Sequence, residues 1–315
     1  MIKKNLFILL TLTAFSIVIT ACVTSKTAEE YANRADAYMA KGNYDRAIAD
    51  YTKAIKIDPN LASAYDNRGS AYYYKGEIDL AISDYTQVLR IDPKFADVYN
   101  ARGYLYHEKG DYDHAIADYT QAINIDPIFA YAYDNRGRAY HDKKDYDRAI
   151  TDYIQAIRID PNAAVPYYNR GRAYHDKGNY DLAIIDYTQA IQIDPNDDII
   201  YIYRGLAYHD KEDYDHVIAD YTQTIRIDSN NNDITFNNRG AAYNDKGDYE
   251  LAIADLDKAI RFNPNYAYPY RHRAFAYMKK GDYRQARADV NKALQIDPSY
   301  QSAKELFAEL EKIGY

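Results

Sequence analysis

Hydrophobic and polar positions recur along this chain with a period of 34 residues, from Ala28 to Tyr300. In most copies, large aromatic residues fall at positions 4, 11 and 24, and small residues fall at positions 8, 20 and 27. Positions 4, 8 and 11 share one face of a helix, and positions 20, 24 and 27 share one face of a second helix. Each copy is therefore predicted to be a helix–turn–helix that stacks on its neighbours in a solenoid.

The second copy shows how the two helices are expected to pack. Small residues at Gly69 and Ala81 leave room for the rings of Tyr72 and Tyr85, so the helices can approach to about 8–10 Å. An Asp-Pro pair closes most copies, because proline disfavours helix at the residue before it. The predicted repeats are 28–61, 62–95, 96–129, 130–163, 164–197, 198–232, 233–266 and 267–300.

These positions resemble the pattern of the tetratricopeptide repeat (TPR) family, with an aromatic at 4, Gly at 8, Tyr at 11, Ala at 20, Tyr at 24, Ala at 27 and Pro at 32. The resemblance covers residues 28–300 and implies an all-α fold, a right-handed α-solenoid of eight helix–turn–helix repeats. It also implies a protein or peptide partner, because the family mostly binds such segments in a concave groove lined by the first helices. Residues 301–315 carry one apolar stripe and are predicted to form a capping helix.

The N-terminus carries the signature of a secreted protein. Lys3 and Lys4 precede an apolar run over residues 6–21, which is short for a membrane span. The single cysteine, Cys22, follows in a sequence that resembles the bacterial lipobox, and this implies cleavage after residue 21 and acylation of Cys22. Residues 22–27 would then be a short tether, and an uncleaved anchor is the alternative.

The predicted location is the cell envelope, where the lipid would anchor the chain to a membrane. Val23 follows the lipidated cysteine, and by resemblance to lipoproteins of diderm bacteria the lack of Asp there fits retention at the outer membrane, facing the periplasm. The net charge of −8 disfavours nucleic-acid binding, because that requires a basic face.

Two charged ladders run through the repeats. Position 7 is arginine in every copy and position 23 is aspartate in every copy, as in Arg170 and Asp186 of the fifth repeat. An arginine beside a packed face requires a partner, and a guanidinium matches a carboxylate in fork geometry. Internal Arg–Asp pairing is therefore predicted, and a free carboxylate-binding stripe is the alternative.

Positions 2, 5, 6, 9, 12 and 13 are expected to line the groove. Position 6 is asparagine in five copies, namely Asn33, Asn67, Asn135, Asn169 and Asn238. An amide both donates and accepts hydrogen bonds, so a column of amides could hold an extended peptide backbone, as in some peptide-binding members of the family. The alternative is that asparagine is only tolerated on a solvated face. No copy has both Lys at position 5 and Asn at position 9, so a chaperone C-terminus is not expected.

Position 12 is histidine in four consecutive copies, each followed by an acid: His107, His141, His175 and His209. Stacked repeats place such residues about 10 Å apart, too far for shared zinc ligands at about 2 Å. A metal site is therefore not predicted. A solvated His–acid face is the plain interpretation, and a pH-responsive groove is the sharper one.

Copies 5 and 6 interrupt the polar groove with apolar residues flanked by arginines. The candidate binding residues here are Tyr168, Ile199, Ile202, Tyr203, Leu206, Arg138 and Arg172. An apolar cluster on a groove wall is typical of a binding site. Copy 6 also departs from the packing pattern near Ser229 and gains a residue there, which predicts a softer joint.

Catalytic motifs are missing from the sequence, and every polar constellation repeats with the 34-residue period, so neither an enzyme, a cofactor nor a small-molecule substrate is expected. We expect a membrane-tethered adaptor that binds a protein or extended peptide in the envelope. The alternatives are an assembly factor for outer-membrane or pilus machinery and a self-associating structural protein.

Overall fold

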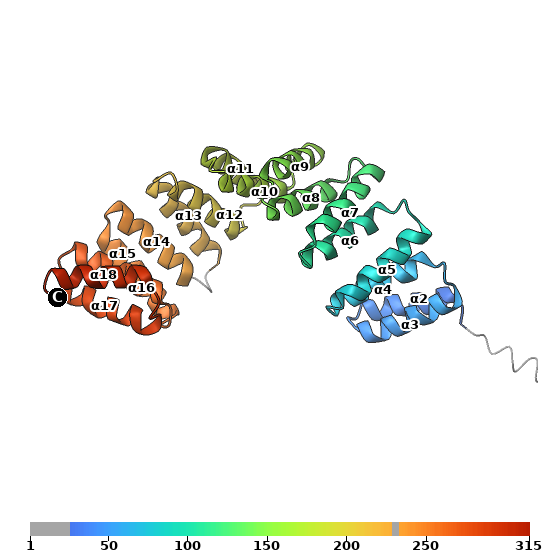
Figure 1. Ribbon diagram of the computed structural model, residues 1–315, viewed down its shortest axis with the longest axis horizontal. Helices are drawn as coiled ribbons and strands as arrows, with labels where there is room; N and C mark the ends of the chain where they lie inside the picture. The colour runs from blue at the N-terminus through green and yellow to red at the C-terminus, as the bar shows by residue number, and fades with distance from the viewer. Residues whose placement is uncertain (1–25, 229–232) are drawn as a thin grey trace, which may run out of the picture. The chain divides into compact units, whose positions relative to one another are not determined.

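A computed structural model describes residues 26–228 and 233–315, and all regular elements in these ranges are helices (Figure 1). They form eight antiparallel pairs and one further helix: α2 (Ala28–Met39) with α3 (Tyr44–Ile57), α4 (Ala62–Tyr74) with α5 (Ile78–Ile91), α6 (Ala96–Glu108) with α7 (Tyr112–Ile125), α8 (Ala130–Asp142) with α9 (Tyr146–Ile159), α10 (Ala164–Asp176) with α11 (Tyr180–Ile193), α12 (Asp198–His209) with α13 (Tyr214–Ile227), α14 (Asp233–Lys246) with α15 (Tyr249–Phe262), α16 (Ala267–Lys279) with α17 (Tyr283–Ile296), and α18 (Gln301–Lys312). The predicted all-α fold of stacked helix pairs with a C-terminal helix is confirmed.

The chain divides into two compact units, one up to Asn135 and one from Arg136 onwards. The boundary falls inside α8, so this helix contributes residues to both units. The softer joint that the sequence predicted at Ser229–Asp233 stays a prediction. Residues 229–232 lie outside the described residues, as do the predicted signal segment and Cys22. In the part that the structure describes, no helix has the length and apolarity needed to cross a membrane.

Local sequence signals set the ends of the second helices. The side chains of Asn43, Asp145 and Asp213 each accept a hydrogen bond from a backbone N–H in the first turn of α3, α9 and α13. The same helices end one residue before an Asp in extended conformation, such as Asp58, which precedes Pro59. The turn inside each repeat contains one residue with positive φ, which is glycine in six repeats and Lys144 or Glu212 in the other two.

Each repeat is packed around a tyrosine, leucine or valine at position 24 that faces the residue at position 8. Tyr153 and Tyr187 are almost completely buried, and a Cβ atom added to Gly137 or Gly171 would lie only 2.6 or 2.7 Å from a carbon of the facing ring. Glycine is therefore required there because the ring occupies the space of a side chain. At Gly205 the approach is looser, since an added Cβ would meet no atom closer than 3.6 Å.

The predicted Arg–Asp pairs form in all eight repeats. In the fifth repeat, Arg170 donates two hydrogen bonds to Asp186, of 2.8 and 2.7 Å, and the aspartate is only 3% exposed. Burial raises the pKa of Asp186 although the hydrogen bonds from Arg170 oppose this change. For Arg170, burial alone would lower the pKa, but the bonds to Asp186 raise it above its ordinary value. The two-pronged geometry matches a guanidinium and an ionised carboxylate, so we assign a charged pair.

The same arginines also connect successive repeats, which the sequence analysis did not predict. Arg68 donates from its second terminal nitrogen to the hydroxyl of Thr52 at 2.9 Å, and Arg204 donates to Thr188 at 3.0 Å. In the last repeat, Arg273 contacts Asp257 at 2.5 Å instead. Each of these arginines lies on the first helix of its repeat. It therefore links the second helix of the same repeat to the second helix of the preceding repeat.

Gly171→Ala is expected to lower the stability of the chain by about 1–3 kcal/mol, because the new methyl group would overlap the buried ring of Tyr187. Gly205→Ala is the matched control. It should be neutral or stabilising by up to about 1 kcal/mol, because alanine favours helix and finds room. Denaturant unfolding of both variants tests this difference, and equal losses of stability would contradict the packing argument.

Candidate functional site

The candidate site lies on the first helices of the second unit. The first helices of successive repeats contact one another, as α10 contacts α12 and α14 contacts α16. We call the surface formed by positions 2, 5, 6, 9 and 12 of these helices the first-helix face. The predicted binding residues from Arg138 onwards belong to this face, and so do His141, His175 and His209 of the histidine ladder; Asn33, Asn67, His107 and Asn135 lie in the first unit.

An aromatic cluster with one cation occupies the first-helix face of α10 and α12. The rings of Tyr168 and Tyr203 meet edge to face at 5.3 Å, and both lie near the buried ring of Tyr187, at 6.2 and 6.3 Å. The guanidinium of Arg172 lies 5.8 Å from the ring of Tyr168 and 5.5 Å from that of Tyr203. Burial, followed by the neighbouring Tyr203, raises the pKa of Tyr168. The structure thus brings together Tyr168, Tyr203 and Arg172, as their spacing suggested.

The predicted apolar residues of α12 differ in how exposed their side chains are. Ile199 and Leu206 are 50% and 38% exposed and share one helix face with Tyr203, since they are spaced by four and three residues. Ile202 instead packs against the buried cluster of Val217, Tyr221 and Ala242 in the neighbouring helices.

Tyr203 requires a correction to its predicted role. The sequence pattern placed this residue outside the packing positions, but its ring contacts Tyr187 and packs against the core around that residue. Position 6 faces the neighbouring repeat, so a large ring there also contributes to the core. Leu206 and Ile199 remain as the apolar side chains that a partner could contact.

The asparagine ladder is engaged in hydrogen bonds between side chains. Asn67 donates to Asp36 at 3.1 Å, and Asn135 donates to Asn100 at 3.0 Å, in each case across a repeat boundary. Asn238 accepts from Asn237 at 3.1 Å, and Asn169 is only 5% exposed. Asn33, in the first repeat, is exposed. Binding of a peptide backbone by these amides remains a prediction.

The histidines contact the acid of the next repeat. The Nε2 atoms of His141 and His175 lie 2.9 Å from carboxylate oxygens of Asp176 and Asp210, although neither pair has the alignment of a hydrogen bond. His141 is only 9% exposed, so the solvated face expected from the sequence is wrong for this residue. Its ring is covered by Tyr146 at 5.3 Å and by the adjoining repeat. Among the described residues, no group of three or more side chains could hold a metal ion.

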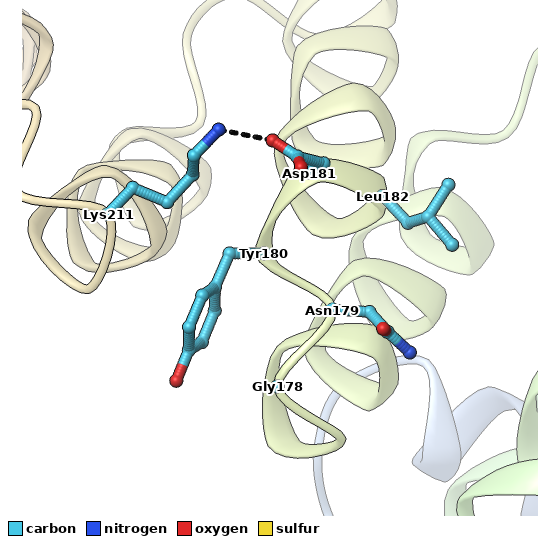
Figure 2. Close-up of a pocket in the computed structure, with 6 residues that line it drawn as sticks. All are labelled: Gly178, Asn179, Tyr180, Asp181, Leu182 and Lys211. Carbon is cyan, nitrogen blue, oxygen red and sulfur yellow. Dashed lines mark hydrogen bonds and ion pairs between the residues drawn. The ribbon is translucent and has the colours of Figure 1, made fainter.

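Small hollows accompany these contacts. One, of about 60 Å³, lies between Arg138, His141 and Arg172 beside the aromatic cluster. Another, of about 300 Å³, lies at the turn between α10 and α11, where Lys211 of the next repeat pairs with Asp181 beside Tyr180 and Leu182 (Figure 2). Similar pairs link Lys75 to Asp45 and Lys246 to Asp215, so the second hollow results from a contact that stacks the repeats.

The sequence analysis missed a buried polar network in the last two repeats. His272 lies where five copies have asparagine, and its Nδ1 atom is 3.0 Å from the side-chain oxygen of Asn237. Asn237 in turn donates to Asn238 at 3.1 Å, and Asn244 donates to the backbone oxygen of His272 at 2.9 Å. The departures from the repeat pattern at positions 5, 6 and 12 were the available signal, with Arg271, His272 and Asn244 in place of the usual residues.

The stacked helix pairs and the side-chain ladders define a helical-repeat scaffold. The chain belongs to the tetratricopeptide repeat family: the TPR repeat family matches residues 35–76, 69–110, 103–144, 137–178, 171–212 and 240–281, and the tetratricopeptide repeat matches residues 267–300. Such proteins generally bind protein partners and are usually not enzymes. The chain is thus a TPR scaffold for protein–protein interaction.

Among curated proteins, no relative matches the chain. Its fold is similar to that of a chain in the crystal structure of the APC/C hetero-tetramer Cut9-Hcn1 (20% identity, TM-score 0.56), where the match covers 95% of this chain and 59% of the other chain. It is also similar to the C-terminal part of a TPR repeat-containing protein of Cytophaga hutchinsonii (21%, TM-score 0.57, 87% of this chain and 98% of that chain). Pseudomonas aeruginosa pilF is similar as well (21%, TM-score 0.55, 64% and 91%). At these identities the likeness shows the fold alone.

The buried His272 is expected to make stability depend on pH. Burial, with a smaller contribution from Arg271, lowers the pKa of His272 to about 4 from an ordinary 6.5. Between these values the unfolded chain binds a proton that the folded chain does not, so the free energy of unfolding should fall as the pH drops through this range. The loss between pH 7.5 and pH 5 should be about 2 kcal/mol.

The variant His272→Asn provides the control, because asparagine occupies this position in five other repeats. Unfolding of both proteins at the two pH values isolates the contribution of this side chain, since all other titrating groups are shared. The variant should lose about 2 kcal/mol less than the parent chain on acidification. Equal losses in the two proteins would show that His272 does not titrate in this way.

Proposed function

We propose that the chain is a membrane-anchored adaptor that binds an extended segment of a protein partner on the first-helix face of α10 and α12, in the cell envelope. The observation that carries the binding surface is the cluster of Tyr168, Tyr203 and Arg172 with the exposed Leu206 and Ile199 beside it. Apolar side chains surrounded by polar groups are where binding energy concentrates.

The chemistry of this surface suits a segment with both apolar and polar groups. Leu206 and Ile199 offer apolar contact, and the hydroxyl of Tyr187 is buried without a hydrogen-bond partner among the described residues. Arg172 supplies a cation that is held by two rings. In such surroundings a side chain of the partner can bury apolar area while its polar groups meet donors.

The anchoring part of the proposal depends on the sequence around Cys22. The apolar run over residues 6–21 and the lipobox resemblance support cleavage before Cys22 and attachment of a lipid, with outer-membrane retention as the proposed location. A tether of residues 22–27 reaches at most about 20 Å when extended, so a bound partner would be held close to the bilayer.

The double variant Ile199→Ala with Leu206→Ala should weaken partner binding by about 2 kcal/mol or more, while leaving the fold intact because both side chains are exposed. Partners captured from envelope extract by the parent chain would be identified and then titrated against each variant. Leu251→Ala is the matched control, because Leu251 is 50% exposed but lies on the second helix α15. Normal binding by the double variant, with loss in the control, would place the binding surface on the second helices.

Cys22→Ala should abolish acylation, because the thiol is the attachment point of the lipid. Incorporation of a fatty-acid probe into the parent chain and the variant measures this directly. Membrane fractionation then shows whether the variant is released from the membrane or retained as the uncleaved chain. Equal labelling of both proteins would contradict the anchor, and it would leave the binding surface on α10 and α12 unaffected.

A further inference from the structure

A separate hollow of about 340 Å³ lies on the first-helix face of the last three repeats. His209 of α12, Asn244 and Asp245 of α14, and Arg271, His272 and Phe275 of α16 line it. Its volume is in the range of pockets that hold a small ligand or a single side chain. None of these residues belongs to the binding surface proposed for α10 and for Ile199 and Leu206 of α12.

Two buried polar atoms of these lining residues have no partner in the part of the chain that the structure describes. They are the Nε atom of Arg271, which is a donor, and the Oδ1 atom of Asn244, which is an acceptor. The orientation of the Asn244 amide is fixed, because its nitrogen donates to the backbone oxygen of His272 at 2.9 Å. Asn244 is only 6% exposed. Buried polar atoms nearly always find a partner, so this pair points to a ligand that accepts from one and donates to the other.

The charges around the hollow favour a neutral ligand. Arg271 and Asp245 both line the hollow and carry opposite charges, and the ring of His272 is neutral at neutral pH because burial lowers its pKa to about 4. His209 faces Asp245 at 3.4 Å. Lys279 lies over the ring of Phe275 at 5.1 Å and adds a cation nearby. A carboxylate would be attracted by the cations Arg271 and Lys279. It would be repelled by the carboxylate of Asp245 and by the unpaired Oδ1 atom of Asn244.

We propose that this hollow binds a primary carboxamide, the side-chain group of asparagine or glutamine, within the bound segment. Its carbonyl oxygen would accept from the Nε–H of Arg271, and its amide N–H would donate to Oδ1 of Asn244. A primary carboxamide presents an oxygen and an N–H on the same edge, whereas a trans peptide group presents them on opposite sides. The inference rests on the proposed function in one respect, that the carboxamide belongs to a bound partner.

The test uses the full chain and small probes, so that it does not require the partner. Propionamide, propionate and N-methylacetamide represent a primary carboxamide, a carboxylate and a peptide group of similar size. They are titrated at constant ionic strength while the backbone amide resonances of Asp245 and Phe275 are followed by NMR. Propionamide should give saturable shifts at these two residues at concentrations where the other two probes give none.

Two variants separate hydrogen bonding from charge and from loss of fold. Arg271→Lys keeps the positive charge but removes the Nε–H, and Asn244→Leu removes the acceptor. Each should weaken propionamide binding about tenfold or more, the equivalent of one hydrogen bond. Leu251→Ala, on the second helix α15 and outside the hollow, should leave it unchanged. An unchanged amide spectrum away from the hollow confirms that each variant folds.

Tighter binding of propionate, retained in Arg271→Lys, would show a site for anions and overturn the proposal. Equal or tighter binding of N-methylacetamide would assign the hollow to a peptide backbone and overturn the side-chain assignment. The absence of saturable shifts with all three probes would also overturn it. Propionamide binding in a chain that captures no partner would instead contradict the proposed function and leave the carboxamide site standing.

Discussion

The paired arginine and aspartate of each repeat are the interaction on which the stacking depends. One guanidinium spans the two helices of its own repeat through two hydrogen bonds to a buried aspartate, as Arg204 does with Asp220. Its remaining nitrogen reaches Thr188 in the preceding repeat. Removing either partner would leave a charge without compensation in a site from which water is largely excluded. Because this ladder uses its charges internally, the first-helix face can carry other residues without losing the register of the repeats.

Much of the fold could be predicted because the same packing positions recur in eight repeats. Gly171 and Tyr187 could be matched from spacing alone, and so could Arg170 and Asp186, since each pair lies within one repeat. The second contact of each arginine was not predicted. A residue's neighbour in the adjoining repeat depends on the stacking of the repeats, which the 34-residue pattern does not specify.

The candidate site was harder to predict for the same reason, and position 6 shows this well. Asn67 bonds to the first helix of the preceding repeat, Tyr203 packs on the core, and His272 is buried in a network with Asn237. One position therefore serves three purposes, each set by the residue opposite it in another repeat. The exposed Leu206 and Ile199 could be placed on one face from helical spacing, but the packing of Ile202 and the burial of His141 could not.

The sixth repeat combines its apolar first-helix face with a relaxed version of the packing rule. Val217 and Thr224 replace the alanines found at positions 20 and 27 of most other repeats, and both are buried. In the same repeat a Cβ on Gly205 would find room that it lacks at Gly171. The ring of Tyr221 is therefore less closely approached by Gly205, and Ile202 packs against the cluster of Val217, Tyr221 and Ala242. The apolar residues of α12 therefore divide into two groups: Ile202 packs against this cluster, while Ile199 and Leu206 are exposed in the described structure.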